Sequence, residues 1–298
     1  MPDTPAAEVD VGEDLVRRLL VDQHPDLARL PLRPKSNGWD NTVWRLGDHL
    51  AVRLPRRTVA ARLVEKEQRW LPTLAERVGA VSDVVLPVPV RVGRPAAGYP
   101  WPWSVVPWVA GRSAATVAPA ARTGLADAVA VVVRALHVPA PPDAPDNPVR
   151  SMPLAGRDDA VRGRLAAASL PRRDEVGALW GELSTTSPWE GPATWIHGDL
   201  HPHNLVVDDD GALAAVIDFG DLTAGDPATD LATAWMTFDA VGRARFRTLL
   251  ANRYDEATWR RAKGWALSIA TAMVVMSDDD EVIRAIGRHT LDEVLGDE

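Results

Sequence analysis

The chain has 298 residues, of which 46% are hydrophobic and 25% charged, as in ordinary globular proteins. This length suffices for one large domain or two modest ones. No cysteine is present, which excludes disulfides, thiolate metal sites and cysteine nucleophiles and fits a reducing compartment. The net charge of -8 argues against a nucleic-acid partner, because phosphate backbones favour basic surfaces.

Neither end of the chain has the pattern of an export or membrane segment. Residues 1–14 are acidic and lack the apolar core of a signal peptide. The longest apolar run near the C-terminus, residues 265–276, is too short to cross a bilayer and predicts a buried helix. We therefore expect a cytoplasmic protein with no membrane partner.

The N-terminal third predicts a small α+β unit. Residues 42–46 and 50–54 alternate in a strand-like way around a Gly-Asp turn, which predicts a β-hairpin. Residues 59–78 have helical periodicity, and the β-branched segments 84–92 and 104–109 predict two further strands. The order strand, strand, helix, strand, strand is typical of an α+β unit.

The pattern changes at Gly111, beyond which most segments have helical periodicity. We expect an α+β protein with two lobes: a small β-rich lobe at residues 1–109 and a larger, mostly helical lobe at residues 110–298. A proline-rich segment at residues 139–148 predicts a surface loop between helices.

Two motifs in the helical half indicate chemistry. The segment IHGDLHPHNL at residues 196–205 is followed by VIDFG at residues 216–220. The apolar residues between the motifs predict two strands, and Asp210-Gly211 is a signal for a two-residue hairpin turn. Such a turn places Asn204 opposite Ile217, with Asp218 one step further along the partner strand.

This register brings Asn204 and Asp218 together at the open end of the hairpin, with Asp199 in the loop that enters it. Carboxylate and amide oxygens are hard ligands that suit Mg²⁺, which also takes phosphate oxygens. Phosphoryl transfer needs metal ions that neutralise charge and a carboxylate that accepts the proton of the attacking hydroxyl. The three residues therefore predict a phosphoryl-transfer site.

The His-Gly-Asp triplet, the asparagine after four further residues and the Asp-Phe-Gly after the hairpin resemble the catalytic core of aminoglycoside phosphotransferases and the related choline-kinase-like enzymes. Protein kinases have His-Arg-Asp at the same place. The resemblance implies a protein-kinase-like bilobal fold in which Asp199 is the catalytic base and Asn204 and Asp218 bind Mg²⁺. It also implies ATP or GTP as the co-substrate and a small-molecule hydroxyl as the acceptor.

The resemblance extends over most of the chain. Residues 38–42 are similar to the family's nucleotide-covering loop, which implies nucleotide contacts for Asn41 and Thr42. Arg53 stands where the family has a phosphate-binding lysine, a departure from the pattern. Glu67 matches the helix glutamate that pairs with that cation.

Two further positions follow from the resemblance. Residues 104–111 resemble the hinge between the lobes, where a carbonyl and an amide hold the adenine edge. Alignment to the glycine assigns these groups to the Pro107 carbonyl and the Val109 amide, and proline can accept there although it cannot donate. Asp230 is expected to brace the catalytic loop.

Two other functions stay open. His197, His201 and His203 are three imidazoles in seven residues and could hold a zinc ion that activates water in a hydrolase. Such sites need further ligands downstream, where only His289 remains. The second alternative is a nucleotide-binding pseudokinase without catalysis, which the arginine at position 53 supports.

The sequence does not identify the acceptor. The resemblance implies antibiotics, with a role in antibiotic resistance, or metabolites such as amino alcohols and sugars. The acidic residues that are candidates for an acceptor pocket are Asp221, Asp239, Asp278, Asp279 and Asp280.

Overall fold

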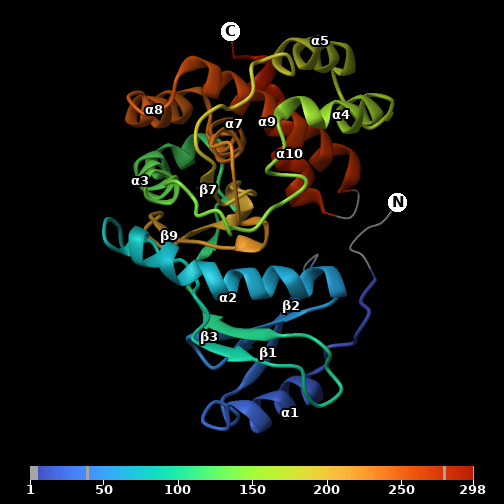
Figure 1. Cartoon of the computed structure of the whole chain (residues 1–298), viewed down its shortest axis with the longest axis vertical. Helices are drawn as coiled ribbons and strands as arrows, with labels where there is room; N and C mark the ends of the chain where they lie inside the picture. Colours follow the sequence, from blue (N-terminus) through green and yellow to red (C-terminus); the bar gives the residue numbers. More distant parts are fainter. Residues whose placement is uncertain (1–5, 38–39, 278–279, 298) are drawn as a thin grey trace.

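The computed structural model describes residues 6–37, 40–277 and 280–297. Figure 1 shows a β-rich lobe below a larger helical lobe, which agrees with the predicted α+β, bilobal class. The predicted boundary between residues 109 and 110 stays a prediction.

The small lobe holds a five-stranded antiparallel sheet in the order β1-β2-β3-β5-β4. Its strands are β1 (Leu32–Asn37), β2 (Asn41–Leu46), β3 (Leu50–Pro55), β4 (Arg91–Gly93) and β5 (Trp103–Pro107), and its helices are α1 (Glu13–Gln23) and α2 (Thr58–Gly79). The predicted hairpin is β2–β3, in which Leu46 pairs with Leu50.

The alternation of side chains gives this sheet two different faces. Trp44 and Leu46 are buried against α1, where Leu19 and Leu20 complete a small apolar core. Arg53 points to the opposite face and meets α2 there. One face is therefore closed by apolar packing, and the other presents a charged group to α2.

The predicted strand at residues 84–92 is largely wrong. Only Arg91–Gly93 joins the sheet, as β4, and Val85 makes a single bridge to Ala215 of the other lobe. Pro87 and Pro89 lack the amide hydrogens that a sheet ladder needs, so the β-branched residues around them cannot extend the strand.

The large lobe is mainly helical, with α9 packed against α4, α5, α6, α7 and α10. Its helices are α3 (Ala126–Leu136), α4 (Asp158–Leu165), α5 (Arg173–Leu183), α6 (Ala228–Leu231), α7 (Thr233–Thr237), α8 (Ala240–Leu250), α9 (Glu256–Met276) and α10 (Glu281–Leu295). Its core includes the fully buried Trp180, Trp235 and Trp265.

Short strands and 3₁₀ turns carry the motifs within this lobe. The strands are β6 (Arg112–Ser113), β7 (Thr194–Ile196), β8 (Leu205–Val207), β9 (Leu213–Val216) and β10 (Thr223–Gly225). The 3₁₀ turns are η1 (Ala114–Thr116), η2 (Pro119–Leu125), η3 (Leu154–Arg157), η4 (Pro202–Asn204) and η5 (Phe219–Asp221).

The β8–β9 hairpin has the predicted register at its open end but a different turn. Leu205 lies opposite Val216, and the Ile217 amide donates to the Asn204 carbonyl at 2.9 Å. At the other end, the Asp208 amide donates to the Ala212 carbonyl across a three-residue loop whose Gly211 has φ +82. A register shift next to Val207 offsets the longer loop, so the two-residue turn is wrong while the pairing at the motifs is right.

Helix α2 links the cores of the two lobes. Its Ala61 belongs to the apolar core of the small lobe, whereas Leu71, Leu74 and Val78 belong to the core of the large lobe. Figure 1 shows α2 lying between the sheet and the helical lobe. Glu67, between these two groups, is thereby held at the junction of the lobes.

The segment after β5 enters the large lobe through a constrained glycine. Gly111 has φ +140, and a Cβ atom built on it would meet the Val207 carbonyl oxygen well inside van der Waals contact. Both the dihedral angle and the close approach therefore require glycine at this position.

We expect Gly111→Ala to lower the free energy of unfolding by about 3 kcal/mol, because alanine must occupy a strained conformation against backbone. Gly181→Ala is the matched control: it lies inside α5 with open space around it, and should raise stability by about 0.5–1 kcal/mol. Denaturant unfolding measures both, and equal stabilities would show that Gly111 is not constrained.

Candidate active site

The catalytic-loop motif is fixed by one buried carboxylate. The amides of His197 and Gly198 each donate to Asp230 at 2.8 Å, and His137 Nε2 lies 3.0 Å from the same carboxylate. Asp230 itself is fully buried. The expected brace of the catalytic loop by Asp230 is therefore observed.

His197 packs beneath the loop. Its ring lies 4.5 Å from that of Phe219, its Nε2 is 3.0 Å from the Ile217 carbonyl, and its Nδ1 accepts from the Asp199 amide at 3.2 Å. This imidazole thus ties the first motif to the second.

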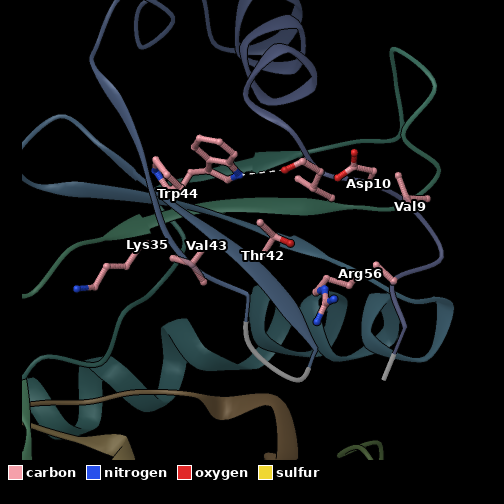
Figure 2. A pocket seen from close by; sticks show the side chains of 10 residues that line it. Val9, Asp10, Lys35, Thr42, Val43, Trp44 and Arg56 are labelled. Carbon is pink, nitrogen blue, oxygen red and sulfur yellow. Dashed lines mark hydrogen bonds between the residues drawn. The ribbon is translucent and has the colours of Figure 1, made fainter. Parts of the chain in front are cut away.

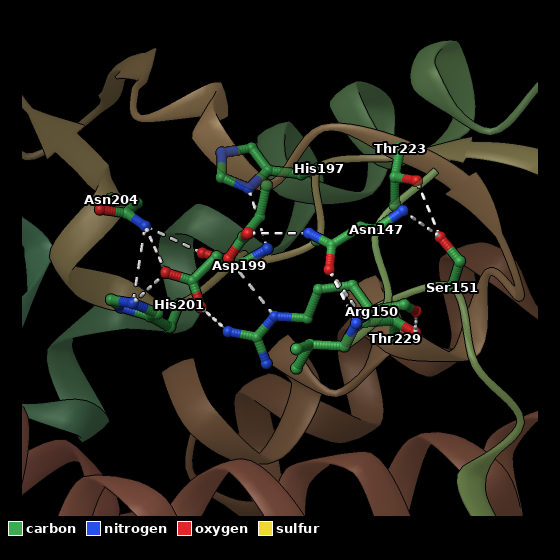
Figure 3. A network of polar contacts seen from close by, with 12 residues as sticks. Asn147, Arg150, Ser151, His197, Asp199, His201, Asn204, Thr223 and Thr229 are labelled. Carbon is green, nitrogen blue, oxygen red and sulfur yellow. Dashed lines mark hydrogen bonds and ion pairs between the residues drawn. The ribbon is translucent and has the colours of Figure 1, made fainter. Parts of the chain in front are cut away.

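Both oxygens of Asp199 have partners (Figure 3). Oδ2 lies 3.1 Å from His201 Nε2 and 3.4 Å from Asn204 Nδ2, and Asn204 also donates to the Asp199 carbonyl at 2.9 Å. Oδ1 accepts from Arg150 Nη2 at 2.7 Å. A carboxylate oxygen can accept two hydrogen bonds, so Oδ1 keeps a lone pair for an incoming hydroxyl.

Arg150 is a residue of this site that the sequence did not indicate. Its Nε lies 3.4 Å from Asp221, and Asn147 Nδ2 donates to the same carboxylate at 2.8 Å. Asn147 is buried, so the proline-rich segment is not simply the surface loop that its composition predicts. The loop instead folds across the catalytic residues.

The charges around Asp199 hold it ionised. Burial alone would raise its pKa, but the charges of His201 and Arg150 and the hydrogen bond from His201 outweigh burial and lower the pKa well below the usual range. The Asp199 carboxylate is therefore in its basic form throughout the neutral pH range.

Asn204 and Asp218 lie at the open end of the β8–β9 hairpin, as predicted. The Asn204 amide nitrogen is directed at Asp199. Asp218 has φ +64, a strained conformation for a residue other than glycine, and its side chain is 58% exposed. Its only ion-pair contact among the described residues is Arg53, at 3.7 Å.

These oxygens fit a magnesium ion better than zinc. A structural zinc site requires a cluster of His, Cys, Asp or Glu side chains around the ion. In the described parts of the chain, no three such side chains are close enough together to hold a metal. Mg²⁺ needs only one or two protein oxygens, because water and phosphate complete its shell. The Asn204 amide oxygen and the exposed Asp218 carboxylate meet that requirement.

The histidine trio does not form the zinc site of the hydrolase alternative. His197 and His201 are buried and engaged with the catalytic loop. The rings of His201 and His203 are 6.2 Å apart, and the His203 amide donates to His201 Nδ1 at 3.3 Å. These contacts position the loop that carries Asp199.

Arg53 and Glu67 form a bidentate pair in the small lobe. Arg53 donates to the two Glu67 oxygens at 2.7 and 3.3 Å, from β3 to α2. Both side chains are largely buried. Through the contact with Asp218, this pair connects the small lobe to the second motif.

Opposing effects act on the two partners. Burial opposes the charge of Arg53, but the carboxylates of Glu67 and Asp218 outweigh burial and raise the pKa of Arg53. Burial raises the pKa of Glu67, against the effect of Arg53. The two Glu67 oxygens each accept a hydrogen bond from the charged Arg53 guanidinium. This bidentate geometry is typical of an ionised carboxylate.

The predicted hinge, residues 104–111, overlaps β5 as far as Pro107 and continues beyond it. Leu50 lies opposite Pro107, and the Trp108 amide donates to the His49 carbonyl at 2.8 Å. The Pro107 carbonyl is trans to the Trp108 amide in the same planar peptide group, so it is directed away from β3 and free of the strand pairing that Trp108 makes. Val109 lies beyond the end of the strand, and its contact with the nucleotide stays a prediction.

Asn41 and Thr42 begin β2, next to residues 38–39, which lie outside the described residues. Thr42 is buried. The Asn41 side-chain oxygen is also buried and has no hydrogen-bond partner among the described residues. Their role in nucleotide binding stays a prediction.

A separate pocket of about 330 Å³ lies between the N-terminal segment and strands β1 and β2 (Figure 2). Its lining residues are Ala7, Val9, Asp10, Val11, Pro34, Lys35, Thr42, Val43, Trp44 and Arg56. Trp44 Nε1 donates to the Val11 carbonyl at 3.3 Å and holds the segment on the sheet. The lining includes Thr42 of the predicted nucleotide-covering loop but no residue of the two catalytic motifs, so this pocket is distinct from the catalytic loop.

The family model of the phosphotransferase enzyme family, APH, matches residues 31–265. This chain belongs to that family. The match includes both motifs, Arg53, Glu67 and the hinge. The phosphotransferase also resembles the uncharacterized protein YcbJ of Bacillus subtilis (strain 168), with 33% identity over 72 residues, or 24% of this chain and 22% of that protein. The aligned part is thus about a fifth of that relative.

Solved structures share the fold of this phosphotransferase. The GDP complex of wild-type aminoglycoside 2′-phosphotransferase-IIIa has a TM-score of 0.67 and 19% identity, covering 96% of this chain and 99% of that chain. The macrolide 2′-phosphotransferase of Brachybacterium faecium has a TM-score of 0.61 and 20% identity, covering 94% and 98%. These likenesses confirm the predicted protein-kinase-like, bilobal fold.

The described parts of the phosphotransferase contain no helix that combines the length and apolar character of a bilayer crossing. The apolar run at residues 265–276 forms the end of α9 and is mostly buried, as predicted.

Asp230→Asn should cost about 3 kcal/mol of unfolding free energy at neutral pH, because an amide group would face the His197 and Gly198 amides. Burial opposes the charge of Asp230, but His137, His197 and the Gly198 amide outweigh burial and lower its pKa. Its stabilisation is therefore present above the unfolded pKa of about 3.9 and is lost as pH falls through the lower folded pKa.

The stability of Asp230→Asn should accordingly vary less with pH below about pH 4 than that of the wild type. Asp210→Asn, at an exposed turn, is the control and should follow the wild type. Urea unfolding across this pH range checks the prediction, which fails if the Asp230→Asn and wild-type curves stay parallel.

Proposed function

We propose that this phosphotransferase moves the γ-phosphate of ATP or GTP to a hydroxyl group of a small molecule, with Mg²⁺ held by Asn204 and Asp218. Solved structures of two proteins with a similar fold support this proposal. One is the complex of an aminoglycoside phosphotransferase, APH(2″)-IIIa, with GDP and kanamycin, and the other is the ternary complex of APH(2″)-IIa with streptomycin and ATP. Antibiotic alcohols are therefore candidate acceptors, with resistance as the candidate role. A cytoplasmic location, which the absence of cysteine fits, belongs to the same proposal.

The observation that carries the proposal is the placement of Asp199. It lies on a loop braced by Asp230, it contacts Asn204, and it is ionised at neutral pH. A base that is fixed, charged and adjacent to metal-binding oxygens is the arrangement that phosphoryl transfer requires.

The chemical step follows from these positions. Asp199 accepts the proton of the acceptor hydroxyl while the hydroxyl oxygen forms a bond to the γ-phosphorus. The bond from that phosphorus to the β–γ bridging oxygen breaks, and the nucleoside diphosphate leaves with the electron pair. Bound Mg²⁺ supplies neutralisation of the phosphate charge.

Arg53 and the hinge would hold the nucleotide. We assign the phosphates to Arg53, whose fork is oriented by Glu67, and the base edge to the Pro107 carbonyl and the Val109 amide. Asn41, on the same sheet face as Arg53, would cover the phosphates from the small lobe, whereas Thr42 shares the face of Trp44 and would contribute its backbone only. Arginine donates two parallel hydrogen bonds, so it can replace a lysine at a phosphate while keeping the glutamate pair.

Asp199→Asn should lower turnover by about 10²–10⁴-fold, because the amide cannot accept the proton. Nucleotide and Mg²⁺ binding should persist in that variant. Asp218→Asn should weaken both nucleotide binding and turnover, because a metal ligand is lost. Nucleoside diphosphate release and calorimetric nucleotide binding measure the two effects.

The exposed Asp209→Asn is the control for both variants. Transfer at the wild-type rate by Asp199→Asn would remove Asp199 as the base. A wild type that binds nucleotide tightly, yet shows neither transfer to any alcohol nor slow hydrolysis of the triphosphate, would favour the pseudokinase alternative.

Arg53→Ala should raise the nucleotide Kd by about 10–100-fold, the value of a charge-assisted contact. Arg53→Lys should keep part of the affinity, since it keeps the charge but loses the fork. Melting temperatures are needed beside the affinities, because Arg53→Ala leaves Glu67 buried without its partner. Unchanged affinity in a folded Arg53→Ala would exclude Arg53 from the nucleotide site, and Arg18→Ala on the outer helix α1 is the control.

A further inference from the structure

Three arginines follow one another along the segment that crosses the catalytic loop. Arg150 lies beside Asp199 (Figure 3), Arg157 ends η3, and Arg164 lies in the last turn of α4. The Arg150 carbonyl accepts from Thr229 at 3.3 Å, which fixes the start of the segment. The segment then packs against α9 through η3 and α4.

The three guanidinium groups differ in their partners. Arg150 is balanced by Asp199 and Asp221. Arg157 and Arg164 have no carboxylate partner among the described residues: Arg157 Nη1 lies 4.0 Å from the Met152 sulfur, and Arg164 Nη1 donates to the Ser268 carbonyl at 3.3 Å. The Arg157 Nε atom is buried and has no hydrogen-bond partner among the residues that the structure describes.

Arg157 immediately precedes α4 and Arg164 lies in its last turn, and their spacing with Val161 places the three on one face of the helix. The two arginines are seven residues apart, which is about two helical turns, and Val161 between them is fully buried. The Ser268 contact shows that this face is directed at α9. Arg162, on another face of the same helix, is exposed and paired with Asp158 at 2.7 Å.

Electrostatics agree with an uncompensated cluster. Burial lowers the pKa of Arg157, and the charge of Arg150 lowers it further. Burial also lowers the pKa of Arg164, together with the charges of Arg157 and Arg150. Partly buried cations that repel one another are costly unless an anion pairs with them.

The acidic residues that the sequence offers for binding a cationic acceptor are engaged elsewhere, as far as the structure describes them. Asp221 pairs with Arg150 and Asn147. Asp239 caps α8 through the Gly242 amide, and Asp280 caps α10 through two amides. Asp278 and Asp279 lie outside the described residues.

We propose that the acceptor carries a carboxylate or phosphate group that binds Arg157 and Arg164 while its hydroxyl lies at Asp199. This inference rests on the proposed kinase activity and names its substrate class. The planar fork of arginine matches both anions. A polycationic acceptor such as an aminoglycoside would be repelled by the same pair, so the likeness to aminoglycoside enzymes does not extend to their substrates.

The first test compares matched acceptors by nucleoside diphosphate release. The panel is glycerol, glycerate and glycerol 3-phosphate, together with glucose, gluconate, glucose 6-phosphate, glucosamine and kanamycin. We expect the anionic members to raise the rate above slow triphosphate hydrolysis more than their neutral or cationic counterparts. A panel led by glucosamine or kanamycin would overturn the inference.

The second test needs no turnover and uses inorganic phosphate as the probe. With nucleoside diphosphate and Mg²⁺ saturating, phosphate should raise the melting temperature of the wild type and of the control Arg162→Gln. The double variant Arg157→Gln/Arg164→Gln should lose the shift, with phosphate affinity reduced about 10-fold or more. Equal shifts in all three proteins would overturn the inference, whatever the panel shows.

The two proposals fail in different ways. Absence of transfer and of triphosphate hydrolysis in the wild type would refute the kinase activity. Transfer to a cationic or neutral acceptor with the same KM in Arg157→Gln, Arg164→Gln and wild type would refute only the anionic acceptor. Slow triphosphate hydrolysis without acceptor should be the same in the wild type and in the control Arg162→Gln, whose exposed side chain pairs with Asp158.

Discussion

The candidate active site depends on one buried carboxylate, Asp230, which accepts hydrogen bonds from two backbone amides. Asp230 holds His197 and Gly198 from a separate helix, and Gly198 has φ +86 with the Asp221 backbone close behind it. The loop can turn only because the second residue is glycine and because both amides have an acceptor away from water. Asp199 follows directly, so its direction is set by this brace, and the contacts from His201 and Asn204 then fix the carboxylate itself.

Local patterns in the sequence were enough for the parts of the site that are close along the chain. The hairpin was predicted because two apolar segments flank the Asp210-Gly211 turn signal, and Asn204 does lie opposite Ile217. The turn type was wrong, yet the register at the motifs was right, because a shift beside Val207 offsets the extra residue in the loop. Both strands are buried at nearly every position, so alternation does not select this pairing, and the hydrogen bond from the Ile217 amide to the Asn204 carbonyl marks it instead.

Contacts between distant segments could not be predicted in this way. Arg150 follows a proline-rich loop whose composition is typical of a surface, and no periodicity connects it with Asp199, which lies 49 residues further along the chain. The segment around Val85 was predicted as a strand because β-branched residues dominate it, although its prolines remove the amides that a ladder needs. In both cases the outcome depends on which distant groups the segment meets.

Two arginines of the site, Arg53 and Arg150, each lie between two carboxylates. Arg53 lies between Glu67 and Asp218, and Arg150 lies between Asp199 and Asp221. Each motif aspartate thus faces a guanidinium from outside its own motif, which reduces repulsion between the carboxylates. A fork can serve two carboxylates at once, whereas an ammonium acts as a point charge, and this explains why arginine suits position 53. Arg157 and Arg164, further along the segment that begins at Arg150, differ from these two arginines because neither has a carboxylate partner among the described residues.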